Sequence, residues 1–422
     1  MTSQLSAVVA VTAAVVSSLA VGCGDVGETG AAPTVRDSAG IRIVENVEPQ
    51  WAEGEGWQLA EEPAVDIGGS EDDPDQQLFH VATALVLADR SIVIANGGTR
   101  ELRFYDRDGA FLSASGGSGE GPGEFKMLGW LGRFAGDSLI AFDVMGRRAS
   151  VFDAEGRFAR SIPFEPSPGM VYPAPIGMFE DGTFPVKRGL WMLGGSGPSR
   201  IERPQEDVFR YAADGKASGK LGSFPSIEFY VGPTGSTRPS GDRVIAQNPR
   251  QFGRYTSYSV YRDRFYVADN ATYEIKAYSP GGQLRSIVRK HHQHLDVTQE
   301  DLDLDLERRL RYMRDEVRRS RVERVFRERP KVSTMPAFGS PAMMAEAVRV
   351  DQVGNLWVLE YSRPSDHRLR WTVFDPDGRL LGTLQLPAGL RLLDIGDDCV
   401  LGLWRDELDV EHVRLYELSK PQ

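Results

Sequence analysis

The chain has 422 residues, a formal net charge of −11 and a mean hydropathy of −0.32. The acidic balance disfavours a nucleic-acid partner, because an acidic surface repels phosphates, and the composition lacks the charge excess of a disordered chain. With 45 glycines, 25 prolines and 9% aromatic residues, it is typical of a soluble protein made of short strands and turns.

The N-terminus is predicted to be an export signal. Residues 7–21 form an apolar stretch that is shorter than the roughly 20 residues needed to span a bilayer, as in the core of a signal peptide. The sequence LAVGC at 19–23 resembles a bacterial lipobox, although Ala20 stands where leucine is usual and the first residues lack Lys and Arg. We predict a signal peptide over 1–22 and lipidation of Cys23. Ordinary cleavage, which would release a soluble secreted protein, is the alternative.

A tether follows the predicted lipid anchor. Residues 23–40 are small and polar, which favours a flexible linker, and we expect a folded domain over 41–422. The chain has two cysteines. If Cys23 carries a lipid, Cys399 has no partner and the mature protein has no intrachain disulfide.

Two repeated signatures predict an array of like units. An aromatic residue followed by a polar turn that ends in glycine occurs five times, which indicates a repeated hairpin. The five hairpins are FYDRDG (104–109), VFDAEG (151–156), RYAADG (210–215), AYSPGG (277–282) and VFDPDG (373–378). A tight turn before a β-rich run occurs six times, at 89–90, 136–137, 181–182, 262–263, 354–355 and 397–398. The chain is therefore predicted to be all-β, a propeller of six blades.

Spacing within the units predicts where loops are inserted. The interval from turn to aromatic residue is the same in blades one, two and four, and it is longer in blades three, five and six. We expect the longer units to carry insertions between their second and third strands, all on one face.

The two ends of the chain are predicted to complete one blade together. The sixth unit ends near Leu418 without a fourth strand, which would leave an unpaired sheet edge. Residues 57–67 (WQLAEEPAVDI) are the natural donor of the missing strand. We expect an N-terminal strand to close the ring.

One segment departs from the β pattern. Residues 298–329 contain no Gly or Pro, and Leu306, Leu310, Met313 and Val317 recur at helical spacing. Thr298 and the acidic residue three positions later resemble a capping box. We predict a helical insertion between blades four and five, whose arginines are explained by pairing with interleaved acids.

The units resemble the NHL-type six-bladed propeller. The sequence NGGTRELRFYDRDG at 96–109, followed by GEGPGEF at 119–125, matches that repeat closely, and blades two and four match in part. The whole chain is similar to bacterial envelope proteins with six-bladed propellers, through VRDSAGIRIVEN, GNLWVLEY and LGLWRDELDVEHVRLYEL. The resemblance implies an architecture but no activity.

Aligned units place one polar residue at the end of each second strand. The six positions are Asn96, Asp143, Lys187, Asp269, Glu360 and Arg405, with Trp404 as an alternative to the last. If these side chains ring one mouth of the channel, they could bind a ligand. Asn96, Asp143, Asp269 and Glu360 could instead hold Ca²⁺, which takes oxygen ligands. In NHL-like repeats this position often pairs with a neighbouring turn, here for example with Arg100 or Arg148.

The sequence leads to two functional hypotheses. The first is a lipid-anchored module of the bacterial cell envelope, periplasmic or at the cell surface, that binds a protein or a small molecule through one face and needs no cofactor. The second is a Ca²⁺-dependent hydrolase or lactonase that uses the carboxylates around the channel. No G-x-S-x-G nucleophile motif is present in the sequence, which gives a serine hydrolase no support.

Overall fold

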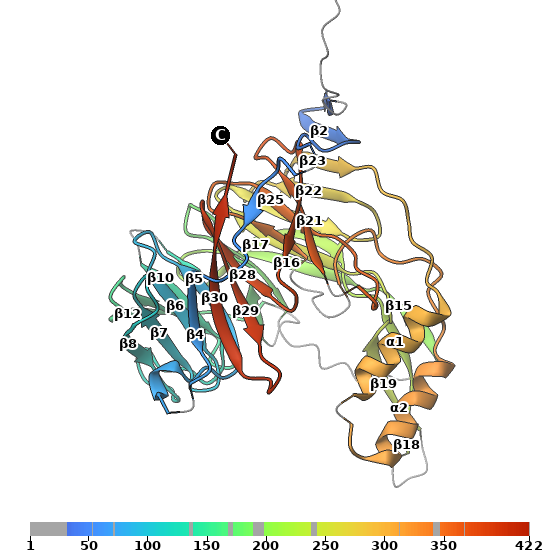
Figure 1. Cartoon of the computed structure of the whole chain (residues 1–422), viewed down its shortest axis with the longest axis horizontal. Helices are drawn as coiled ribbons and strands as arrows, with labels where there is room; N and C mark the ends of the chain where they lie inside the picture. The colour runs from blue at the N-terminus through green and yellow to red at the C-terminus, as the bar shows by residue number, and fades with distance from the viewer. Residues whose placement is uncertain are drawn as a thin grey trace, which may run out of the picture.

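The computed structural model is a β-propeller, with antiparallel sheets arranged around a central axis (Figure 1). It describes residues 32–52, 54–70, 72–134, 138–167, 172–188, 198–237, 243–311, 313–340, 347–366 and 368–421. The predicted signal peptide, the lipidation site at Cys23 and the turn at 136–137 lie outside these residues.

The first three propeller sheets have four strands each, in chain order from one edge to the other. The first sheet contains β5 (Val81–Val86), β6 (Ile92–Asn96), β7 (Glu101–Tyr105) and β8 (Phe111–Gly116). The second contains β9 (Leu128–Arg133), β10 (Leu139–Asp143), β11 (Arg148–Phe152) and β12 (Phe158–Pro163). The third contains β13 (Pro173–Pro175), β14 (Phe184–Arg188), β16 (Gln205–Tyr211) and β17 (Ala217–Pro225).

Three further sheets repeat this plan in the second half of the chain. The fourth sheet contains β20 (Thr256–Tyr261), β21 (Arg264–Asp269), β22 (Glu274–Tyr278) and β23 (Leu284–Lys290). The fifth contains β24 (Val348–Val350), β25 (Leu356–Leu359), β26 (Leu369–Phe374) and β27 (Leu380–Leu386). The sixth contains β28 (Arg391–Ile395), β29 (Cys399–Arg405) and β30 (Glu411–Ser419). The five predicted hairpins each join the third and fourth strands of a sheet, which confirms that signature.

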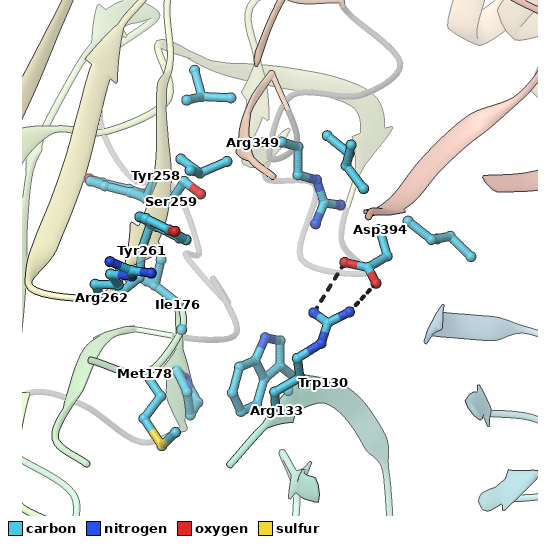
Figure 2. Close-up of a pocket in the computed structure, with 18 of the residues that line it drawn as sticks. Trp130, Arg133, Ile176, Met178, Tyr258, Ser259, Tyr261, Arg262, Arg349 and Asp394 are labelled. Atoms are coloured by element: carbon cyan, nitrogen blue, oxygen red, sulfur yellow. Dashed lines mark hydrogen bonds and ion pairs between the residues drawn. The ribbon is translucent and has the colours of Figure 1, made fainter. Parts of the chain in front are cut away.

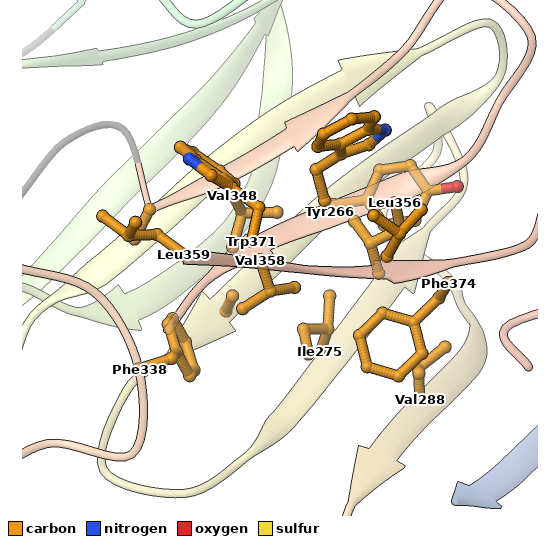
Figure 3. Close-up of a cluster of buried hydrophobic side chains, with 14 of the residues drawn as sticks. Tyr266, Ile275, Val288, Phe338, Val348, Leu356, Val358, Leu359, Trp371 and Phe374 are labelled. Carbon is orange, nitrogen blue, oxygen red and sulfur yellow. The ribbon is translucent and has the colours of Figure 1, made fainter. Parts of the chain in front are cut away.

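The hydrophobic core consists of clusters between consecutive sheets. Second strands such as β6 and β10 are buried at every position, whereas the outermost strand β8 alternates between half-buried and exposed. The largest cluster packs β21–β23 against β25 and β26, around Trp371, Val358 and Phe338 (Figure 3). Another cluster packs the sixth sheet against the first, through Leu401 and Ile94. The packing therefore continues from the last sheet to the first.

An N-terminal strand closes the sixth sheet, as predicted. The strands β3 (Gln58–Leu59) and β4 (Val65–Gly68) both pair antiparallel with β30, with Val65 opposite Leu415. Between β4 and β5 lies only the short 3₁₀ helix η1 (Pro74–Gln76). Closure satisfies the backbone groups of the edge that the last strand would otherwise expose.

The folded part begins earlier than expected. The strand β1 (Thr34–Ser38) lies inside the predicted tether and pairs with β2 (Ile41–Asn46), which extends the fourth sheet by a parallel pairing with β23. A turn at Ala39 and Gly40, both with positive φ, joins the two strands. Every residue of β1 is exposed, so the strand forms through its turn and backbone pairing and leaves no apolar pattern to recognise.

A second unit projects from the propeller, and only its helices were predicted from the sequence. A sheet of β15 (Arg200–Glu202), β18 (Phe229–Thr237) and β19 (Arg243–Pro249) lies beside the helices α1 (Gln299–Leu310) and α2 (Glu316–Glu328) (Figure 1). Helix α2 contacts β18, and Arg329 lies 5.7 Å from the ring centre of Tyr230.

The helical insertion is confirmed between β23 and β24, but it forms two helices rather than one. Thr298 caps α1 in a capping box with Asp301, whereas the chain leaves the helix after Leu310 and Asp315 caps α2. Leu306 and Leu310 are buried, but Val317 is 71% exposed, so the predicted apolar stripe ends at the break between the helices. Within the described residues, neither helix is long and apolar enough to cross a membrane.

The insertions leave the propeller at one end. Because neighbouring strands in each sheet are antiparallel, the connections from second to third strand and from the fourth strand to the next sheet emerge together. The β15–β18–β19 sheet and both helices belong to such connections, and we call this end the insertion face. The opposite end carries the tight turns before the second strands, and we call it the turn face. In the sixth sheet the longer interval comes from longer strands, not from the predicted loop, because Arg405 pairs directly with Glu411.

Candidate functional site

The predicted strand-end residues lie at the insertion face, where they fasten local loops. Asn96 is fully buried, accepts a hydrogen bond from the Phe79 N–H at 2.8 Å and donates to Thr99 Oγ1 at 3.0 Å. Asp143 is also fully buried and accepts from the backbone N–H groups of Lys126, Met127 and Gly146 at 2.9–3.0 Å. These side chains satisfy backbone donors that would otherwise be buried without partners.

The other strand-end residues form ion pairs with their neighbours. Asp269 receives two hydrogen bonds from Arg203, at 2.6 and 3.1 Å. Glu360 accepts from Lys290 Nζ at 3.1 Å and lies 3.3 Å from the Arg370 guanidinium. Arg405 donates to Glu411 at 2.6 Å.

Each of these contacts engages a strand-end residue with a neighbouring group. Within the described parts of the chain, no three His, Cys, Asp or Glu side chains gather closely enough to hold a metal ion. Of the expected pairings, Asn96 bonds to Thr99 instead of Arg100, whereas Arg148 lies 3.9 Å from Asp143, within ion-pair distance as expected. Calcium binding at Asn96, Asp143, Asp269 and Glu360 would require these bonds to break.

A central cavity of about 480 Å³ lies elsewhere, between the first strands of the sheets. Its wall comes from β9, β20, β24 and β28 and from the residues that follow β13 (Figure 2). Strand β20 contributes most of its length, including Tyr258, Tyr261 and the adjoining Arg262. Of the predicted site residues, only Lys187 lines this cavity. A volume of this size is typical of sites for small molecules.

The cavity wall is basic although the chain is acidic. Four cationic side chains line it, from Arg133, Lys187, Arg262 and Arg349, against the single carboxylate of Asp394. Figure 2 shows Arg349 extending from β24 into the space between Tyr261 and Asp394. Concentrated positive charge inside a walled cavity attracts anions more strongly than the same charge on an open surface.

One cation of the wall is engaged in a structural ion pair. The Arg133 guanidinium bonds to both carboxylate oxygens of Asp394 and donates to the Val86 carbonyl at 2.8 Å. The Val86 N–H in turn donates to Asp394 at 2.9 Å. The pair therefore links the first strands of the sixth, first and second sheets, and most of its charge is neutralised internally.

Two other cations have fewer partners. Within the described residues, the Arg262 guanidinium contacts only the Tyr261 ring, whose centre is 5.3 Å away, and makes no ion pair. Its backbone has a φ of 52°, so the residue closes the tight turn after β20 and its exposed side chain lies at the turn-face mouth of the cavity. Arg349 differs, because it donates to the Leu392 carbonyl at 3.3 Å.

Lys187 lies farther inside, beside a buried carboxyl group. Its ammonium is 3.8 Å from Glu206 Oε2 and 5.1 Å from the centre of the Tyr258 ring. Glu206 is 5% exposed, its Oε2 faces the Tyr258 hydroxyl at 3.4 Å, and its Oε1 is buried without a hydrogen-bond partner in the described structure. Burial raises the pKa of Glu206, opposed by the charge of Lys187. Burial and the neighbouring Glu206 also raise the pKa of Tyr258.

Of these cavity residues, Lys187 was predicted as a binding residue because it ends a second strand, and the others were not predicted. Arg262 appeared only as half of a turn signature, and Glu206 carries no motif. The positions of Arg262 and Glu206 beside the cavity depend on how the third and fourth sheets pack, and no short sequence motif encodes that packing. The one available signal was chemical: Lys187, like Arg405, is a cation at a position where the other four aligned units have Asn, Asp or Glu.

Similarity to known proteins is found among solved structures. No family model and no curated protein sequence matches the chain. Among solved structures, a protein described as exported, from Bacteroides fragilis, is 14% identical with a TM-score of 0.45, covering 90% of this chain and 100% of that one. A member of the DUF4221 family from Bacteroides vulgatus is 8% identical with a TM-score of 0.48 (87% and 99% covered). A gluconolactonase from Xanthomonas campestris is 13% identical with a TM-score of 0.38 (81% and 87%).

Proposed function

We propose that this protein is a binding module of the bacterial cell envelope that takes a small organic anion into its central cavity. The observation that carries the proposal is the concentration of four cationic side chains and one carboxylate around about 480 Å³ in a chain of net charge −11. Trp130 and Tyr261 add aromatic surface on opposite sides of the cavity (Figure 2). Cations with apolar walls suit a ligand that has an acidic group on a carbon skeleton.

Location and architecture form part of the same proposal. The six propeller sheets are six blades of an NHL-like ring, which an N-terminal signal peptide directs out of the cytoplasm. Cys23 carries the lipid that holds the protein at the membrane, and the following residues connect this anchor to β1. A binding module held in the envelope would meet small anions that enter or leave the cell.

Arg349 provides the first test. We expect isothermal titration of the full-length protein with a panel of carboxylates and phosphates to detect binding, and Arg349→Met to weaken it about tenfold, as expected for loss of a charged hydrogen bond. Arg285→Met, an exposed arginine on β23, is the matched control and should keep full affinity. Absence of binding throughout the panel, or equal loss in both variants, would contradict the proposal.

A further inference from the structure

Two cations of the cavity are placed to bind different groups of one ligand. This inference rests on the proposed function and concerns Lys187 and Arg262. Neither ends in a hydrogen bond to a protein acceptor within the described residues: Lys187 has an ion pair at 3.8 Å and an aromatic ring, and Arg262 has an aromatic ring alone. Their N–H groups are therefore the available donors of the cavity wall.

The two cations lie at different depths along β20. Lys187 lies over Tyr258, whereas Arg262 follows Tyr261 at the turn-face mouth. Tyr258 lies in the middle of β20, whereas Arg262 follows the end of this strand in the tight turn, so the two cations reach the cavity at different depths. A ligand that contacts both must therefore carry two acidic groups at separate points of its skeleton.

Glu206 determines how strongly Lys187 can hold an acidic group. The charged groups that face Glu206 are Lys187 and Arg188 from β14, and Tyr258 faces it from β20. An ionised Glu206 competes with the ligand for the Lys187 charge and repels a second carboxylate nearby. A neutral Glu206 leaves the Lys187 charge to the ligand, and it also lowers the cost of burying Oε1 without a partner.

We propose that the ligand is a dianion whose acidic groups bind Lys187 and Arg262, and that binding at Lys187 is accompanied by uptake of a proton on Glu206. The ligand thus has two carboxylates or phosphates at separate ends of a chain or ring. Binding weakens as the pH rises through the pKa of Glu206, because the ionised form must gain a proton when the ligand enters.

The ligand class is tested with a series of linear dicarboxylates from succinate to azelate, each compared with the monocarboxylate of equal length. Titration of the full-length protein at pH 6.0 should give an optimum at one chain length, bound at least about tenfold more tightly than the matched monocarboxylate, and adipate serves as the reference ligand of the series. Lys187→Met should remove this advantage and leave the monocarboxylate affinity nearly unchanged. Lys216→Met, an exposed lysine outside the cavity, serves as the control.

Proton uptake is tested by repeating the titration at pH 8.0 and in buffers of different ionisation enthalpy. The wild-type protein should bind adipate more weakly at pH 8.0 and take up a proton at pH values where Glu206 is ionised in the free protein. Glu206→Gln should bind with equal affinity at both pH values and without proton uptake. A thermal unfolding midpoint near that of the wild type would show that the variant is folded.

The outcomes separate this inference from the proposed function. Equal affinity for mono- and dicarboxylates, with no effect of Lys187→Met, would overturn the dianion while leaving anion binding intact. Unchanged pH dependence in Glu206→Gln would overturn the proton uptake. Failure of every carboxylate and phosphate to bind would overturn both proposals together.

Discussion

The insertion face and the central cavity use polar side chains in opposite ways. At the insertion face, Asp143 is fully buried and accepts three backbone hydrogen bonds. In the central cavity, Lys187 and Arg262 have aromatic contacts, and neither donates a hydrogen bond to a protein acceptor within the described residues. The polar position that recurs at the ends of second strands is thus used for structure in the other sheets, whereas Lys187 occupies it in the third sheet and lines the cavity.

The largest expected effect is on stability at the insertion face. Asp143→Ala removes the shared acceptor of three backbone N–H groups and leaves a gap in place of a fully buried side chain, so we expect the free energy of unfolding to fall by about 3 kcal/mol or more. Urea unfolding measures this loss, and Asp108→Ala, in an exposed hairpin turn, is the control. Adipate affinity of the folded variant should stay at the wild-type value. A large loss of adipate affinity would show that the insertion face and the cavity are not functionally separate.

A substitution in the cavity wall is expected to have a smaller effect, on anion affinity and on stability. Asp394→Asn removes the one carboxylate among the described residues of the wall and frees the Arg133 charge, so anion affinity should rise about threefold. Stability should fall by about 1 kcal/mol, because the Arg133 side chain is 39% exposed and its ion pair is partly screened. Titration and urea unfolding of the same preparation measure both changes. A fall in anion affinity would mean that the ion pair itself forms the binding surface.

A further effect, which appears only on acidification, is a pH dependence that arises at the insertion face. Burial, with the charges of His294 and Lys290, lowers the pKa of His292 to about 4, and its Nε2 is buried without a hydrogen-bond partner in the described structure. The unfolded chain takes up a proton at this histidine near pH 6.5, where the folded chain does not. Stability should therefore decrease as the pH falls from about 6.5 toward 4.

His292→Phe should reduce that decrease, whereas the exposed neighbour His291 provides the control variant His291→Phe. Unfolding curves at pH 7.0 and 5.0 measure the difference. The same substitutions should leave the pH dependence of adipate binding unchanged, because that dependence is assigned to Glu206. If the substitution changed the pH dependence of both stability and adipate binding, the insertion face and the cavity would be coupled.

The propeller scaffold could be predicted because the residues that form its turns lie close together in the sequence. In three of the hairpins the aspartate of the turn bonds to N–H groups within its own turn: Asp106 to Ala110, Asp153 to Arg157 and Asp375 to Arg379, each at 2.8 Å. A short motif is sufficient to encode such a turn, and the motif repeats because the turn repeats. The closing strand was predictable for a similar reason, since the last unit lacks an edge partner.

The candidate site was not predictable in the same way. Glu206, Lys187 and Tyr258 come from β16, β14 and β20, and their contact depends on the packing of the third sheet against the fourth. Alignment of the units named Lys187 as a candidate binding residue at the end of its second strand, but it gave no sign that Glu206 and Tyr258 would lie beside it. The projecting β15–β18–β19 sheet was missed because its strands come from two separate insertions.

The closure of the ring by β4 and β30 also affects the order in which the chain can fold. Val65 emerges from the ribosome long before its partner Leu415. A contact of such long sequence separation forms slowly, and the first sheet must wait for the sixth before its packing is complete. This delay suits a chain that is predicted to cross a membrane before it folds. The strand β30 then completes the propeller only after all six sheets have arrived.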